Sequence, residues 1–466
     1  MKRLFYTLLF FLPCMLIACG GSDDTPDGDN NPPVVAPPSE EPVDSRLLYN
    51  GIRLPEQWPP VRSSSSELEK GMSPFYLSDK PSVINISVGR QLFVDNFLIE
   101  STNLKRTFYY PEYYSGNPIL TPEQDWEKTG TKGAAFAAPF SDGVWYDEKE
   151  GKYKMWYMAG GGSYATSGAG VTCYAESTDG IHWTKPILSV VAGTNIVDYN
   201  SERDASVVWL DKQESNASKR YKMFLVARES GKWRYHYKTS PDGKVWRAAV
   251  QSEPIADRST VYKNPFRNVW VYSMRHNVRV DANKLVRARD YNENADPEAG
   301  TKKAEALLSA FWFGPWANEQ HHTDYPNIAP AIYNQDATPY ESIMLGFFSV
   351  WQGPENDVCA SDNVIKRNQV MVGYSRDGYS WFREDMNPFH AVNTTTSDAW
   401  NQGNLQSVAG APLIVGDKLY FYLSGRRLRG TQEITTTGLA MLRRDGFASM
   451  KGTGELQTSL LKFDGS

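Results

Sequence analysis

The chain of 466 residues has few cysteines and few histidines. Its four cysteines and six histidines are scattered, and nowhere do they have the close spacing that the ligands of a zinc site show. Because Cys14 and Cys19 belong to an N-terminal segment, Cys173 and Cys359 leave at most one disulfide and no disulfide framework. The sequence therefore predicts no metal site of the zinc type and no cofactor.

The chain also lacks a long basic run and a long amphipathic helix pattern. Its formal net charge of -5 argues against nucleic acid as a partner. Apolar residues occur instead in short runs between turn-forming residues, which favours strands. Aromatic residues make up 13% of the chain, with 14 Trp and 26 Tyr, which suits a β-rich core or a surface that stacks on sugars.

The N-terminus has the pattern of a secretion signal. Two basic residues precede an apolar run from Leu4 to Ala18, which is shorter than the roughly 20 residues that a helix needs to span a bilayer. The segment 16–19, Leu-Ile-Ala-Cys, resembles the lipobox of bacterial lipoproteins. We expect a signal peptide over residues 1–18, cleavage before Cys19 and lipidation of Cys19. The alternative is an ordinary signal peptide beside an accidental cysteine.

Residues 19–45 have the composition of a flexible tether. Gly, Ser, Asp, Asn and Pro dominate this segment, and it has too few apolar residues to fold. The expected location is therefore outside the cytoplasm, in the periplasm or at the cell surface. The lipid on Cys19 is the only expected contact with a membrane.

Three segments repeat one phrase, in which Ser or Thr is followed after one or two residues by Asp-Gly, then by two further residues and Trp. Asp in such a phrase caps its own backbone and Gly takes a positive φ, so each phrase predicts a tight turn that closes a hairpin. The three phrases end at Trp183, Trp246 and Trp381.

Pairs of predicted strands precede and follow these turns and divide the chain into similar units. The expected pairs are 144–147 with 153–157, 207–211 with 221–224, 264–265 with 269–272, 334 with 343–346, and 417 with 419–422. The five units lie near residues 134–186, 203–248, 257–292, 322–384 and 402–448. Units of this size, each a small antiparallel sheet, predict an all-β fold, a five-bladed β-propeller. An irregular β-sandwich is the alternative.

The propeller is expected to span residues 86–450, after an N-terminal extension over 46–85. The mostly apolar segment 90–100 is expected to form a buried strand that pairs with the last blade and closes the ring. The tail over 451–466 is interpreted as the possible start of a truncated β-sandwich.

Carboxylates recur at one position of the predicted units. Asp204 precedes Asp211 by seven residues, and Asp257 precedes Asn264 by seven, so both are expected at one level of adjacent inner strands. A pair of carboxylates is what hydrolysis of a glycosidic bond needs. Asp204 and Asp257 are therefore the candidate catalytic aspartates, and Glu341 is the candidate proton donor. Asp147 and Asp211 are expected to be structural turn residues.

Several further residues are candidates for binding a substrate. Arg258 and Arg275 are suited to a carboxylate or sulfate on a sugar, although ion pairs with the aspartates are the equal alternative. His322, Asp324 and Gln406 are also expected to contact the substrate. The sequence leaves open whether a calcium ion occupies the central channel.

Four segments carry a resemblance to a known family. They are Phe93–Glu100, Tyr153–Tyr157, Asp257–Thr260 with Asn264–Phe266, and Gly438–Phe447. These segments resemble secreted bacterial proteins related to the five-bladed propeller glycoside hydrolases of families 32 and 43. The resemblance covers about residues 85–450 and implies two aspartates and a glutamate on inner strands.

The chain departs from that family at two points. Phe140-Ser-Asp142 stands where family 32 has a Trp-Met-Asn-Asp-Pro-Asn opening, and the third unit has no clear Glu. The resemblance therefore does not imply that this protein acts on fructans. The expected function is hydrolysis of glycosidic bonds in an extracellular or periplasmic polysaccharide or oligosaccharide. The alternatives are a non-catalytic glycan-binding lipoprotein and a protein-binding propeller, whose channel would have apolar or uncharged walls.

Overall fold

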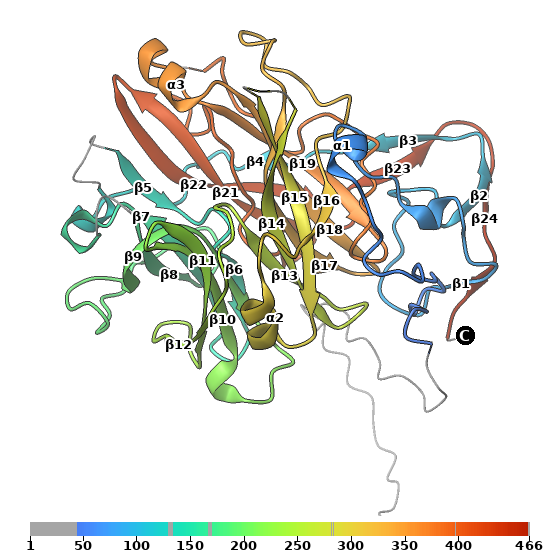
Figure 1. Ribbon diagram of the computed structural model, residues 1–466, viewed down its shortest axis with the longest axis horizontal. Helices are drawn as coiled ribbons and strands as arrows, with labels where there is room; N and C mark the ends of the chain where they lie inside the picture. The colour runs from blue at the N-terminus through green and yellow to red at the C-terminus, as the bar shows by residue number, and fades with distance from the viewer. Residues whose placement is uncertain are drawn as a thin grey trace, which may run out of the picture. The chain divides into compact units, whose positions relative to one another are not determined.

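The computed structural model describes residues 44–128, 134–165, 170–280, 282, 284–396 and 398–464. The predicted signal peptide, Cys19 and nearly all of the tether lie outside these residues. The described part is mostly β-strand, as the short alternating runs predicted (Figure 1). Its short helices are α1 (Ser64–Glu67), α2 (Pro297–Lys303) and α3 (Asn356–Asp362), with 3-10 turns at Phe75–Leu77, Asp125–Glu127, Gly162–Tyr164 and Ala217–Lys219.

Antiparallel meanders follow one another along the chain, and each takes its name from one of its central strands. The β7 meander has β5 (Ala135–Ala138), β6 (Val144–Asp147), β7 (Lys152–Ala159) and β8 (Gly170–Ser177). The β10 meander has β9 (Ile196–Leu210), β10 (Tyr221–Glu229), β11 (Lys232–Ser240) and β12 (Arg247–Gln251). The β14 meander has β13 (Thr260–Asn264), β14 (Val269–Arg279), β15 (Leu285–Asn294) and β16 (Ala310–Phe313). The β18 meander has β17 (Ala331–Tyr340), β18 (Ile343–Gly353) and β19 (Arg367–Ser375), and the β21 meander has β20 (Leu413–Val415), β21 (Lys418–Arg429) and β22 (Gln432–Arg443).

The strand pairs expected from the sequence are confirmed. The pairs β6–β7, β9–β10, β13–β14, β17–β18 and β20–β21 are all antiparallel. Strand β9 is long because its first part pairs with β8 and its second part pairs with β10. One continuous strand therefore carries the chain from the β7 meander into the β10 meander.

The three repeated phrases form the same turn, as predicted. In each, a serine hydroxyl accepts a hydrogen bond from the glycine N–H, at 2.9 Å from Gly180, 2.9 Å from Gly243 and 2.8 Å from Gly378. The aspartate between them accepts two further backbone N–H bonds. The three glycines have φ of 73°, 77° and 74°, a conformation that favours glycine.

Each of these turns also binds a neighbouring meander. The carbonyl of Gly243 accepts a hydrogen bond from Trp156 of the β7 meander at 2.6 Å, and that of Gly378 accepts one from Tyr262 of the β14 meander at 3.1 Å. The carbonyl of Gly180 accepts one from Tyr422, which joins the β7 meander to the β21 meander. The phrase thus both reverses the chain and fastens one sheet to another.

Apolar side chains fill the spaces between consecutive meanders. Trp145 packs on Trp209 with ring centroids 4.9 Å apart, and Trp209 packs on Trp270 at 5.8 Å. A second cluster joins the β18 and β21 meanders through Phe347 and Phe421. A third joins the β21 meander to the β7 meander, so that the last meander in the chain packs on the first.

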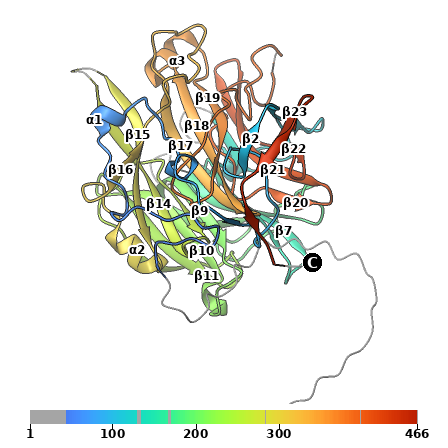
Figure 2. The same cartoon turned by 90° about the vertical axis from the view of Figure 1, so that its right-hand side faces the viewer.

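The N- and C-terminal parts of the described chain lie side by side (Figures 1 and 2). The four pairs are β1 (Ile84–Asn85) with β25 (Leu461–Lys462), β2 (Ile99–Thr102) with β24 (Leu456–Thr458), β3 (Lys105–Phe108) with β23 (Ala448–Lys451), and β4 (Glu112–Tyr113) with β22. The tail beyond residue 450 therefore pairs with the segments that precede the β7 meander.

The expected strand over residues 90–100 is wrong in extent and in partner. Most of its apolar residues are buried, as predicted, but only its end belongs to a strand, and that strand pairs with β24. The buried carboxylate of Asp95 interrupts the pattern because it accepts the N–H of Phe97 and pairs with the buried guanidinium of Arg376 at 2.8 Å. The strand that pairs antiparallel with the last meander is β4 instead.

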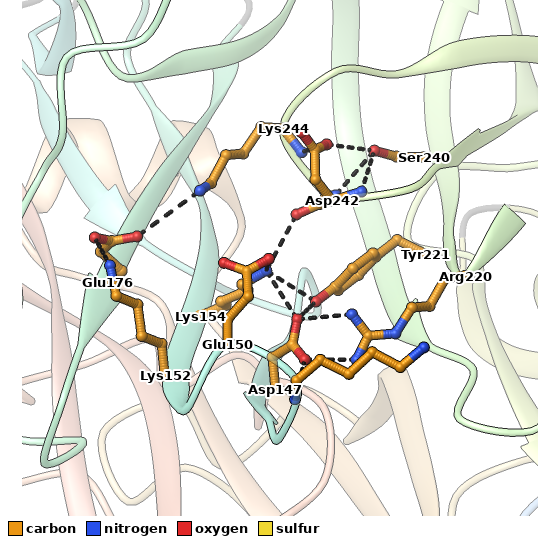
Figure 3. A network of polar contacts seen from close by, with 12 residues as sticks. Asp147, Glu150, Lys152, Lys154, Glu176, Arg220, Tyr221, Ser240, Asp242 and Lys244 are labelled. Carbon is orange, nitrogen blue, oxygen red and sulfur yellow. Dashed lines mark hydrogen bonds and ion pairs between the residues drawn. The ribbon is translucent and has the colours of Figure 1, made fainter. Parts of the chain in front are cut away.

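A network of charged side chains joins the β7 and β10 meanders (Figure 3). The buried carboxylate of Asp147 lies 2.9 Å from the buried ammonium of Lys154 and also binds Arg220 and the hydroxyl of Tyr221. These donors hold the pKa of Asp147 below its ordinary value although burial opposes them. The predicted structural role of Asp147 is confirmed.

Both cysteines of the described part are free, so the one disulfide that the sequence allowed does not form. Cys173 is buried in β8 and Cys359 lies on α3. Within the described residues no helix has the length and apolar character needed to cross a membrane.

Candidate functional site

The structure brings Asp204 and Asp257 together, each beside an arginine. Asp204 lies in β9, and Asp257 lies three residues before β13. Asp204 accepts the backbone N–H of Arg258 at 2.8 Å and lies 2.7 Å from the Arg258 guanidinium, while Asp257 pairs with Arg275 of β14. The sequence left open whether these arginines bind an anionic group of a sugar or pair with the aspartates, and the structure contains the ion pairs with the aspartates.

The backbone of Arg258 is unusual at this point. Its φ is 54°, a conformation that costs free energy for any residue but glycine and that persists only where surrounding contacts impose it. This conformation directs the N–H of Arg258 to one oxygen of Asp204. The position of Asp204 is thus fixed from both the backbone and the side chain of one residue.

The two aspartates differ in burial. Burial raises the pKa of Asp204, and the neighbouring charge of Asp257 raises it further, against the opposing effect of Arg258. Asp257 is more exposed, with 25% of its side chain accessible against 13% for Asp204. The raised pKa makes Asp204 the candidate for holding a proton.

Three cations surround one phenol next to these carboxylates. The buried ring of Tyr333 in β17 has Arg258 at 5.8 Å, Arg287 of β15 at 4.7 Å and Lys366 at 5.7 Å from its centroid. Together they lower the pKa of Tyr333 although its burial alone would raise it. Arg287 also lies close enough to Arg275 to disfavour its charge.

A cluster of short polar side chains lies further along β17. The amide of Asn334 donates to the hydroxyls of Ser141 and Ser407, each at 3.1 Å, and lies 3.4 Å from Asp336. These residues come from the β7 and β18 meanders and from the segment before β20, so the starts of three meanders meet there. The buried oxygen of Asn334 and the buried amide nitrogen of the neighbouring Gln406 have no hydrogen-bond partner among the described residues.

The structure does not bring Glu341 to the aspartates. Glu341 lies in the turn after β17, where it pairs with Arg90 at 2.7 Å and with Arg444 at 3.5 Å. Eight residues separate it from Tyr333, which is about 26 Å along a strand. Glu341 therefore links the turn after β17 to the N-terminal segment. It lies too far from Asp204 to donate a proton to a glycosidic bond bound there.

The other candidate residues occupy two places. His322 and Asp324 lie near Arg367, which follows Lys366 in the chain, and Arg367 and burial lower the pKa of His322. The side chain of Gln406 is buried and accepts the amide of Asn404 at 3.3 Å. His322 and Asp324 thus lie near Arg367, and Gln406 lies beside the polar cluster.

The carboxyl group of Asp336 predicts a measurable pH dependence of stability. Burial raises its pKa from 3.8 to about 7, so between these values the folded protein keeps a proton that the unfolded chain has lost. Stability therefore falls as pH rises through this window, by about 1.4 kcal/mol for each pH unit. Asp336→Asn, which is neutral at any pH, is expected to gain stability relative to the wild type between pH 5 and pH 8. Urea unfolding at both pH values measures this gain, and an identical pH dependence of the two proteins would contradict it.

Sequence reasoning missed Tyr333, Arg287 and Lys366. The alternation Arg287-Ala-Arg289 places both arginines on one face of β15, and this alternation was a usable signal in the sequence. The sequence around Lys366 contains no such signal, because only the packing of the β18 meander brings Lys366 to Tyr333. Among the described residues, no three His, Cys, Asp or Glu side chains gather in a way that could hold a metal ion.

Comparison with known proteins finds similar structures. No protein-family model and no curated protein matches the chain. A structure described as a glycoside hydrolase is 14% identical, covers 73% of this chain and 94% of its own, and has a TM-score of 0.44. A glycosyl hydrolase from Bacteroides ovatus is 13% identical over 74% of this chain and 97% of its own, with a TM-score of 0.43. A fructofuranosidase variant from Schwanniomyces occidentalis, complexed with fructosylnystose, is 11% identical over 73% of this chain and 64% of its own, with a TM-score of 0.40.

Proposed function

We propose that the protein is a glycoside hydrolase that acts on a polysaccharide or oligosaccharide outside the cytoplasm, with Asp204 and Asp257 as its catalytic carboxylates. The observation that carries the proposal is the pairing of these two groups beside Arg258 and Arg275, because two neighbouring carboxyl groups, one of them with a raised pKa, are the arrangement that glycosidic bond cleavage uses. Asp204 donates a proton to the leaving oxygen, and Asp257 acts on the anomeric carbon directly or through water.

The arginines define how each aspartate works in this proposal. Arg275 forms an ion pair with Asp257, and Arg258 fixes the orientation of Asp204 through its backbone N–H. Neither contact prevents Asp204 from carrying a proton, because its burial outweighs the effect of Arg258 on its pKa. In this proposal Asp204 therefore carries the proton that the leaving group receives.

The architecture and location belong to the same proposal. The meanders are interpreted as the blades of a five-bladed β-propeller, which the packing of the last meander on the first supports. The N-terminal sequence supports a lipoprotein anchored through Cys19 at the periplasmic or cell-surface side of a membrane. A polysaccharide substrate fits that location, since large glycans do not enter the cytoplasm.

The proposal is tested by incubating the purified protein with a panel of plant, algal and bacterial polysaccharides and measuring new reducing ends. We expect product from at least one glycan with the wild type and none with the double variant Asp204→Asn/Asp257→Asn, whose folding is checked by circular dichroism. Glycan binding without product from the wild type would favour the non-catalytic binding protein. Product formation that survives the double substitution would place the chemistry elsewhere.

A further inference from the structure

The cations around Tyr333 outnumber the carboxylates that neutralise them. Arg258 and Arg275 have Asp204 and Asp257 as ion-pair partners. Within the described residues, neither Arg287 nor Lys366 forms an ion pair, and their contacts are with the Tyr333 ring. The cluster therefore carries two positive charges without a partner, in a chain whose net charge is negative.

These two cations are held in partly buried positions. Arg287 and Lys366 are each partly covered, and the ring between them is buried. A partly desolvated charge without a partner is unfavourable. Such a charge is retained most readily where a bound anion compensates it.

The strand pattern explains why the cations face one point. Arg275, Arg287 and Arg289 lie on one face of the β14–β15 pair, since Arg275 is opposite Arg289 and Arg287 is opposite Asn277. Lys366 reaches the same ring from the segment before β19. Two separate meanders thus supply positive charge to one place beside the catalytic pair.

We propose that Arg287 and Lys366 bind an anionic group on the sugar ring, a carboxylate or a sulfate ester, of the glycan whose bond lies at Asp204 and Asp257. This inference rests on the proposed function, because that function places the cleaved bond at Asp204 and Asp257. Binding of the anionic sugar can still be measured without cleavage. The guanidinium of Arg287 gives two parallel N–H donors to such a group, and Lys366 adds a point charge. A neutral glycan would leave both cations unpaired.

Binding of monosaccharides tests this site without hydrolysis, because these probes contain no glycosidic bond. The probes are galacturonate, glucuronate, galactose 6-sulfate, and the neutral sugars galactose and glucose, measured by calorimetry with the wild type. We expect a uronate or the sulfated sugar to bind about tenfold or more tightly than its neutral counterpart, with weaker binding at high salt. Which of the two anions binds identifies the source of the charge. Equal affinity for charged and neutral sugars would overturn the inference.

Three variants locate the binding site. Arg287→Gln and Lys366→Gln are each expected to weaken binding of the anionic sugar about tenfold. Lys263→Gln is the matched control, because Lys263 is also partly buried and stacks on an aromatic ring, Trp270, at 5.2 Å, but in another part of the β14 meander. It is expected to change nothing, and an equal loss in all three variants would contradict a specific site.

Hydrolysis assays separate failure of this inference from failure of the proposed function. Cleavage of a neutral glycan that needs Asp204 but is unaffected by Arg287→Gln would overturn the anionic substrate and leave the hydrolase intact. Binding of anionic sugars that Arg287→Gln weakens, without cleavage of any glycan, would retain the anion site and overturn hydrolysis.

Discussion

Asp204→Asn is expected to lower kcat/KM by about 10²–10⁴-fold on a natural glycan, because an amide cannot donate the proton that the leaving oxygen needs. Asp257→Asn is expected to be at least as damaging, since it removes the group that acts on the anomeric carbon. The loss of kcat/KM caused by Asp204→Asn should depend on the leaving group of the substrate, whereas the loss caused by Asp257→Asn should not. An aryl glycoside with an acidic phenol leaves without protonation, so Asp204→Asn should keep much of its activity on that substrate whereas Asp257→Asn should not.

The measurement is kcat/KM for both variants on a natural oligosaccharide and on an activated aryl glycoside of the same sugar. Asp211→Asn is the matched control, because Asp211 follows the end of the same strand and pairs with Lys222 at 3.0 Å. It should leave activity unchanged. Equal losses by Asp204→Asn on both substrates would mean that Asp204 is not the acid. Wild-type activity should also fall as pH rises through the elevated pKa of Asp204.

Asp147→Asn is expected to lower the free energy of unfolding by about 3–5 kcal/mol, the usual cost of removing one partner from a buried ion pair. The carboxylate of Asp147 is inaccessible and accepts from three side chains at once, those of Lys154, Arg220 and Tyr221 (Figure 3). Lys154 retains Glu150 at 2.7 Å, but Arg220 loses its only ion pair among the described residues. The substitution therefore weakens the contact between two meanders.

Urea unfolding at pH 7 measures this loss, and Asp211→Asn again serves as control. Asp211 occupies the same position of the next strand pair, but it is partly exposed, and Lys222 keeps Glu214 at 2.9 Å. A loss of about 1 kcal/mol or less is expected for the control, and equal losses would contradict the network. Because the folded pKa of Asp147 lies below its ordinary value, its stabilisation is present above about pH 4 and is lost as the pH falls further.

Local patterns in the sequence predicted the parts of the fold that depend on local chemistry. The turn at Ser177-Thr-Asp-Gly180 needs only a serine, an aspartate and a glycine in sequence, so its geometry follows from those residues. The strand expected over residues 90–100 is wrong for the complementary reason. Its alternation is apolar, but the charge of Asp95 finds its partner, Arg376, nearly three hundred residues later, and no local pattern reports such a partner.

The candidate site divides in the same way. Equal seven-residue spacing placed Asp204 and Asp257 at one level, and the structure brings them together. The choice of Glu341 relied on its residue type and on its place before an apolar strand. Its actual position is the far end of β17, bound to Arg90, because a strand of ten residues separates its two ends widely.

By itself the sequence determined the β-rich class, the repeated turns, the strand pairs and the two aspartates, since each depends on residues near one another in the chain. Only the tertiary structure decided which charges meet: Asp204 with Arg258, Asp257 with Arg275, and Arg287 with Lys366 on Tyr333. The physical reason is that side-chain electrostatics acts over a few ångströms in space, and packed sheets bring together residues that lie far apart in the chain.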